Sequence, residues 1–154
     1  MKDKKKGKID FESSIGPWLG KTVKVLDYYI QEKLDAKDLD LTKEQMIVLK
    51  KLHDKDGLNQ NDLAFLTLRN KSSLTRLLTK MENKNYIIRV KRKEDKRINN
   101  VFLTESGREV FVKVQPVIKS MIAQIEKNIS EEEKEQMIRI IKKIQSNFNT
   151  NIES

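Results

Sequence analysis

The sequence contains no cysteine, a single histidine (His53) and only five glycines. Without cysteine the chain forms no disulfide, no thiolate zinc site and no thiol redox sensor. One histidine supplies too few groups for a histidine-rich metal site or a Ser-His-Asp triad, and the glycines form no phosphate-binding fingerprint. We therefore expect no catalytic residues, no metal and no cofactor, and we predict that the protein is not an enzyme.

Long apolar runs are also missing. No stretch approaches the ~18 apolar residues that a membrane span needs. The basic start MKDKKKGKID is not followed by the apolar segment of a secretory signal. With 154 residues, 37% hydrophobic and 36% charged, the sequence predicts a single cytoplasmic domain with a small core. An oligomeric interface would allow further apolar surface to be buried.

Positive charge is concentrated in one part of the chain. Eleven lysines and arginines lie from Arg69 to Arg97 against three acidic residues, which gives this segment +8 of the total +9. A basic stripe of this kind is typical of proteins that bind a phosphate backbone. Charge alone leaves open the alternative of a solvated basic surface.

Apolar residues spaced by three or four positions predict a chain of helices. They cover about residues 14–34, 42–56, 60–68, 71–83, 104–128 and 130–148. Asn70 and Thr104 are placed to cap the fourth and fifth helices, and Ser130 with Glu133 forms a capping box for the last one. Pro116 is expected to kink the fifth helix or to interrupt its hydrogen-bond ladder.

The pattern changes after the fourth helix. Residues 86–90 and 100–103 are rich in β-branched and aromatic side chains, and the segment between them is polar and strongly charged. This pattern predicts an antiparallel hairpin with a long basic tip, that is, a wing. The two short helices before it, 60–68 and 71–83, are so closely connected that they look like a helix-turn-helix.

Several short motifs occur in order along the helix-turn-helix, the wing and the last two helices. They are Leu63-Ala64, Lys-Ser-Ser-Leu-Thr-Arg-Leu-Leu at 71–78, Met81-Glu82, Asp-Lys-Arg at 95–97, Val-Phe-Leu-Thr-Glu-Ser-Gly at 101–107 and Ile-Ser-Glu-Glu-Glu at 129–133. Together they resemble the MarR family of bacterial regulators over about residues 14–149, including its Asp-x-Arg and Leu-Thr-x-x-Gly motifs. Asn85 stands where that family usually has glycine, and asparagine tolerates the left-handed backbone better than other non-glycine residues.

The resemblance implies a mainly α fold with a small β-hairpin wing (α+β), namely a winged helix-turn-helix with N- and C-terminal dimerisation helices. We expect a basic flexible tail at 1–13, one domain at 14–149 and a C-terminal tail at 150–154. Within the domain, the expected dimerisation helices are about 14–36 and 104–149, and the expected winged helix-turn-helix is about 41–103.

A recognition helix places its N-terminal residues near base edges in the major groove. The candidates for this role, or for phosphate contacts from the same helix, are Lys71, Ser72, Ser73, Thr75, Arg76 and Lys80. In the wing, the resemblance implies that Arg97 enters the minor groove while Asp95 holds it. The candidates for phosphate contacts there are Lys91, Arg92, Lys93 and Lys96. The alternatives, a solvated helix face and an ion pair that only shapes the loop, remain open.

The resemblance further implies a homodimer that binds double-stranded DNA at pseudo-palindromic operators and regulates transcription, more often as a repressor. It also implies a small aromatic or anionic effector that relieves repression. The candidate pocket residues are Phe11, Trp18, Tyr28 and Tyr29, although such aromatics more often belong to a core. The alternative function is a winged-helix interaction module, or a nonspecific DNA-coating protein, without effector control.

Overall fold

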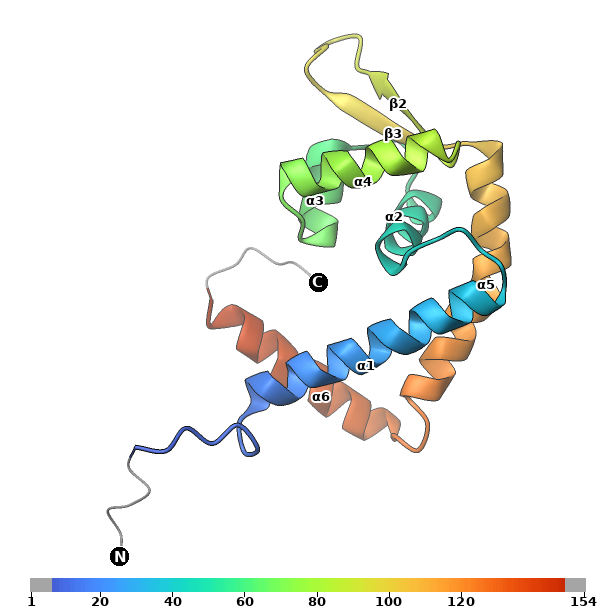
Figure 1. The fold of residues 1–154 in the computed structure, drawn as a ribbon. Helices are drawn as coiled ribbons and strands as arrows, with labels where there is room; N and C mark the ends of the chain where they lie inside the picture. The colour runs from blue at the N-terminus through green and yellow to red at the C-terminus, as the bar shows by residue number, and fades with distance from the viewer. Residues whose placement is uncertain (1–6, 149–154) are drawn as a thin grey trace, which may run out of the picture. The chain divides into compact units, whose positions relative to one another are not determined.

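Six helices and a three-stranded antiparallel sheet make up residues 7–148 of the computed structural model, the part of the chain that the structure describes (Figure 1). In chain order they are α1 (Ile15–Ala36), α2 (Lys43–Asp54), β1 (Leu58–Asn59), α3 (Gln60–Thr67), α4 (Lys71–Asn83), β2 (Ile87–Lys91), β3 (Asn99–Leu103), α5 (Glu105–Ile125) and α6 (Glu131–Ser146). The chain divides into two compact units, Met1–Lys43 and Glu44–Ser154. The mainly α fold class with a small wing is confirmed.

Residues 1–6 of the expected basic tail and the whole of the expected C-terminal tail, 150–154, lie outside the described residues. In the described part of the first tail, the Asp10 carboxylate accepts hydrogen bonds from the backbone N–H of Glu12 and from the Ser13 hydroxyl. Residues 10–14 therefore form a turn in front of α1. Across the described chain, no helix has the length and apolarity needed to cross a membrane.

The sheet has the strand order β1-β3-β2. β2 and β3 form the predicted hairpin, in which Ile87 pairs with Leu103 and Lys91 pairs with Asn99. β1 adds a third strand through the pairs Leu58–Val101 and Asn59–Asn100. The sequence analysis missed β1, because a strand of two residues is too short to show alternating hydrophobicity.

The core of the second unit joins α2, the helix-turn-helix, the base of the wing and α5. Its fully buried side chains are Val48, Leu49, Leu52, Leu63, Leu74, Leu78, Met81, Ile87, Val101 and Val114, with Phe111 almost fully buried. In α4 the buried residues are Leu74, Leu77, Leu78 and Met81. These four are the predicted apolar stripe of that helix. Each such side chain contributes roughly 1.5–3 kcal/mol by burial, so this face fixes α4 while its other face meets solvent.

The caps predicted at Asn70, Thr104 and Ser130 are present. The side chains of Asn70, Thr104 and Ser130 each accept a hydrogen bond from the backbone N–H three residues later. Asn85 has a φ of 63°, which is the left-handed conformation that its place in the sequence suggested. α5 continues through Pro116, whose missing N–H removes one bond of the ladder without ending the helix. The helix ends at Ile125, three residues earlier than expected, before a turn that contains the left-handed Asn128.

We expect Ser130→Ala to lower the free energy of unfolding by about 1 kcal/mol, a typical cost for losing an N-cap. Ser130 Oγ accepts from the Glu133 N–H at 3.1 Å, and Glu133 returns a bond to the Ser130 N–H at 3.0 Å. Urea unfolding followed by circular dichroism measures the change. Ser146→Ala is the control, because it removes only a hydroxyl that donates to a carbonyl in the same helix. Equal effects of the two changes would contradict a specific role for the cap.

Candidate nucleic-acid interface

The turn between α3 and α4 sets the start of the candidate recognition helix. Leu68 adopts a left-handed conformation at φ 54°, and its N–H returns to carbonyls of α3. Asn70 then caps α4 by accepting the Ser73 N–H at 2.8 Å. These two residues end α3 and start α4 within three positions, which gives the close connection that the sequence predicted.

The predicted contact residues of α4 fall into two groups. Lys71, Ser72, Arg76 and Lys80 are exposed. Ser73 is half-buried, and its Oγ accepts a hydrogen bond from Arg69 Nη2 at 2.7 Å. Thr75 is exposed, but its Oγ1 donates to the Lys71 carbonyl at 2.8 Å. Ser73 and Thr75 therefore hold the first turns of α4 in place, a role that the sequence did not reveal.

The tip of the wing is a closed loop built around Asp95. The N–H of Arg92 donates to the Ile98 carbonyl at 2.8 Å, and the N–H of Ile98 donates to the Asp95 carbonyl at 3.0 Å. Asp95 Oδ1 accepts from the backbone N–H of Arg97 at 3.0 Å and from its Nε at 3.2 Å. The hydrogen bond from the Arg97 backbone, followed by that from the Arg97 side chain, holds the pKa of Asp95 below its usual value.

Arg97 is the most projecting of the wing arginines. Its side chain is 91% exposed although its Nε is bonded to Asp95. The structure thus contains the predicted Asp95–Arg97 contact, with the rest of the guanidinium facing solvent. Lys91, Lys93 and Lys96 are also exposed, whereas Arg92 is half-buried with Nη2 at 3.4 Å from Asn100 Oδ1.

An ion pair that the sequence analysis missed links α4 to the wing. Arg89 in β2, only 19% exposed, donates to both carboxylate oxygens of Glu82 at 3.1–3.2 Å and to Thr79 Oγ1 at 3.2 Å. Hydrogen bonding to Arg89 lowers the pKa of Glu82, so the pair stays charged at neutral pH. The signal in the sequence was that Glu82 is the only acid between Arg69 and Lys93.

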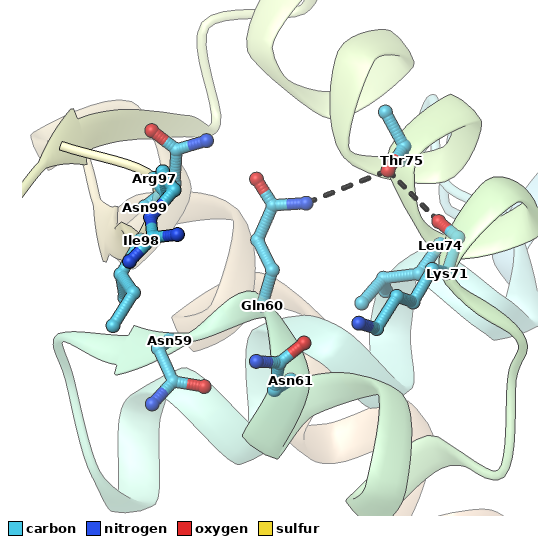
Figure 2. A pocket seen from close by; sticks show the side chains of 9 residues that line it. All are labelled: Asn59, Gln60, Asn61, Lys71, Leu74, Thr75, Arg97, Ile98 and Asn99. Atoms are coloured by element: carbon cyan, nitrogen blue, oxygen red, sulfur yellow. Dashed lines mark hydrogen bonds between the residues drawn. The ribbon is translucent and has the colours of Figure 1, made fainter. Parts of the chain in front are cut away.

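A cleft of about 230 Å³ lies between the helix-turn-helix and the wing (Figure 2). Its walls come from residues 59–61 at the start of α3, from Lys71, Leu74 and Thr75 of α4, and from residues 97–99 of the wing. No acidic side chain lines it. The candidate major-groove and minor-groove elements are therefore two sides of one polar cleft.

The candidate effector residues all lie in the first unit and are exposed there. These residues are Phe11, Trp18, Tyr28 and Tyr29. The rings of Tyr28 and Tyr29 meet edge to face at 5.5 Å, and Trp18 Nε1 donates to the Glu12 carbonyl at 2.7 Å. None of the four lines the cleft described above, so their role as an effector pocket stays a prediction. In the described residues, no group of three or more His, Cys, Asp or Glu side chains is placed to hold a metal.

Comparisons with known proteins agree with this geometry. The model of the MarR family matches residues 41–98. The transcriptional regulator HosA of Escherichia coli O157:H7 is 30% identical over 105 residues, which cover 68% of this chain and 78% of HosA. The regulator SarZ of Staphylococcus haemolyticus is 29% identical over 127 residues, which cover 81% and 80%. The crystal structure of the S. aureus MepR–DNA complex, 29% identical, superposes with a TM-score of 0.79 over 90% of this chain and 99% of that chain. The chain therefore belongs to the MarR family of transcriptional regulators.

Proposed function

We propose that this regulator is a homodimeric repressor that reads a pseudo-palindromic DNA operator with α4 and the wing of each protomer. One observation carries the proposal: the exposed side of α4 and the Asp95-bound Arg97 belong to the same unit and flank one cleft. The similarity to MepR, whose structure was solved with DNA, supports it. Two such surfaces related by two-fold symmetry face half-sites about one DNA turn apart.

Arg76 is the proposed base-reading residue. It is exposed and lies one turn into α4, behind the capped first turn that Asn70 and Ser73 fix. An arginine in this position can donate two parallel hydrogen bonds to O6 and N7 of guanine. Lys71 and Lys80, which are exposed on the same helix, suit phosphate contacts.

Arg97 is the proposed minor-groove residue. Narrow A·T-rich minor grooves concentrate negative potential and attract an inserted arginine. Asp95 restrains the Arg97 side chain at Nε and leaves the other guanidinium nitrogens to face outward. This restraint reduces the conformational entropy that Arg97 loses on entering the groove.

The effector is a further part of the proposal. A small aromatic or anionic molecule relieves repression only if it binds better to the dimer whose recognition helices are misplaced for DNA. The exposed aromatic side chains of the first unit, Trp18 and Tyr28 among them, are the proposed contact surface. Repression itself then requires only that the dimer occupies the promoter.

The test compares Arg76→Ala and Arg97→Ala with the wild type in fluorescence anisotropy, on an operator selected from random duplexes and on its scrambled form. We expect the wild type to bind the operator at least ~10³-fold more tightly. Arg76→Ala should cost about 1–3 kcal/mol per half-site on the operator alone. Arg97→Ala should weaken binding most where the flanking minor groove is A·T-rich.

Lys119→Ala is the matched control, since Lys119 is an exposed cation in α5, outside the cleft. It should bind the operator like the wild type. Equal and salt-steep binding of the wild type to both duplexes would replace specific repression by the DNA-coating alternative. Absence of binding even at low salt would favour the winged-helix interaction module.

A further inference from the structure

Glu82, near the C-terminal end of α4, binds one residue of the wing through three donors. Its carboxylate accepts the backbone N–H of Arg89 at 3.2 Å, Arg89 Nε at 3.2 Å and Arg89 Nη2 at 3.1 Å. Arg89 Nη2 also donates to Thr79 Oγ1 at 3.2 Å, about one turn earlier in α4. Arg89 is therefore fastened to α4 through its main chain and its side chain together.

The bond to the Arg89 main chain has a particular consequence for the wing. β2 is an edge strand, since the strand order of the sheet is β1-β3-β2. In an edge strand, every second backbone N–H points away from the sheet and has no partner strand. Glu82 supplies an acceptor for the Arg89 N–H on this open side. The carboxylate thus fixes the strand itself relative to α4, and the planar guanidinium adds a second, directional attachment.

The two elements that this pair joins carry the two proposed groove-binding arginines. α4 bears Arg76, and β2 leads into the wing tip with Arg97. Specific binding requires both arginines to lie in their grooves at once, whereas nonspecific binding depends mainly on phosphate contacts and tolerates a wing that moves. We propose that Glu82 and Arg89 are positioning residues, which set the angle between the wing and α4 and thereby the discrimination between operator and other DNA. This inference rests on the proposed function.

Two substitutions that change the charge in opposite directions test the pair. Glu82→Ala removes an acid and Arg89→Ala removes a cation, so electrostatics alone should tighten binding to a scrambled duplex in the first and weaken it in the second. We nevertheless expect the ratio of operator affinity to scrambled-duplex affinity to fall about tenfold in both, because an unrestrained wing has to be ordered at each half-site. The double variant should lose no more, since either change alone breaks the pair. Fluorescence anisotropy on the two duplexes measures these affinities.

Glu94→Ala is the matched control. It also removes an acid, from an exposed position of the wing, and should tighten binding to both duplexes while their ratio stays within about twofold of the wild type. Tighter binding of Glu82→Ala to the scrambled duplex is a result that a folding defect cannot produce. An unchanged ratio in Glu82→Ala, or a double variant that loses the product of the two single losses, would overturn positioning by the pair and leave the proposed function intact. A wild type that binds both duplexes equally, or neither, would overturn the proposed function and this inference with it.

Discussion

Gly107→Ala is expected to lower the free energy of unfolding by about 3 kcal/mol or more. A Cβ added at Gly107 would lie 2.1 Å from the carbonyl oxygen of Tyr86 and 3.0 Å from its carbonyl carbon. The obstacle is backbone, so no side-chain rotation relieves the clash. Overpacking of this kind usually costs about 1–3 kcal/mol, and more where the neighbour cannot move.

The Tyr86 backbone cannot move freely because it is bonded to the same turn. Its carbonyl accepts the Thr104 N–H at 3.1 Å. Thr104 Oγ1 in turn donates to the Asn85 carbonyl at 2.5 Å and accepts the Gly107 N–H at 2.9 Å. Separating Gly107 from Tyr86 would therefore disturb the cap of α5 and the base of the wing together.

Urea unfolding followed by circular dichroism measures this effect, and Gly20→Ala serves as the control. Gly20 also lies within a helix, α1, but a Cβ there would have no atom within 4 Å. Alanine in a helix is favoured over glycine by roughly 0.5–1 kcal/mol, so the control should be neutral or slightly more stable. If Gly107→Ala unfolds at the urea concentration of the wild type, the close approach to Tyr86 is not a constraint.

The helices could be predicted because their signals are local. The apolar stripe of α4 and the caps at Asn70, Thr104 and Ser130 each depend on residues within a few positions of one another. Gly107 was visible only as part of a motif, and the Tyr86 carbonyl behind it is 21 positions away in the chain. The sequence therefore showed that Gly107 belongs to the Leu-Thr-x-x-Gly motif, but it did not show the close approach of the Tyr86 carbonyl that requires a glycine there.

Contacts between elements could not be predicted in the same way. The pairing of Leu58 with Val101 joins residues far apart in the sequence, and no alternating pattern marks a two-residue strand. The sequence analysis counted Arg89 among the basic residues of the stripe, whereas in the structure its guanidinium forms an ion pair with Glu82. The cleft combines three separate segments, so its amides had no common pattern in the sequence.

Side-chain contacts link the wing to both α4 and α5. The Glu82–Arg89 pair joins α4 to β2, and Thr104 ends β3 while it caps α5. Asp56 adds a further link, since its carboxylate accepts the Leu103 N–H at 2.9 Å and pairs with Arg108 of α5 at 2.9 Å. We expect a displacement of α5 to reach the wing through these contacts, as the proposed relief of repression through the dimerisation helices requires.

The second large effect concerns the proposed dimer: Ile140→Glu is expected to raise the dimer dissociation constant by more than about 100-fold. α6 has no buried residue. Its Met137 and Ile140 are exposed, Ile140 by 41%, and so is Phe148 just after the helix. Exposed apolar side chains repeated along one helix are what the proposed dimer would bury. Two-fold symmetry places the new carboxylate in the proposed interface twice. The dimer therefore loses the apolar burial twice and bears the free-energy cost of an unpaired buried charge twice.

Sedimentation equilibrium measures the assembly, and anisotropy on the selected operator measures its consequence. Because α4 and the wing are unaltered, monomers of Ile140→Glu should retain weak binding to a single half-site while tight binding to the full operator is lost. Gln136→Glu, an exposed position of the same helix, is the control and should remain dimeric. A dimer of Ile140→Glu with unchanged stability would place the interface elsewhere, and a monomeric wild type would remove the dimer from the proposed function.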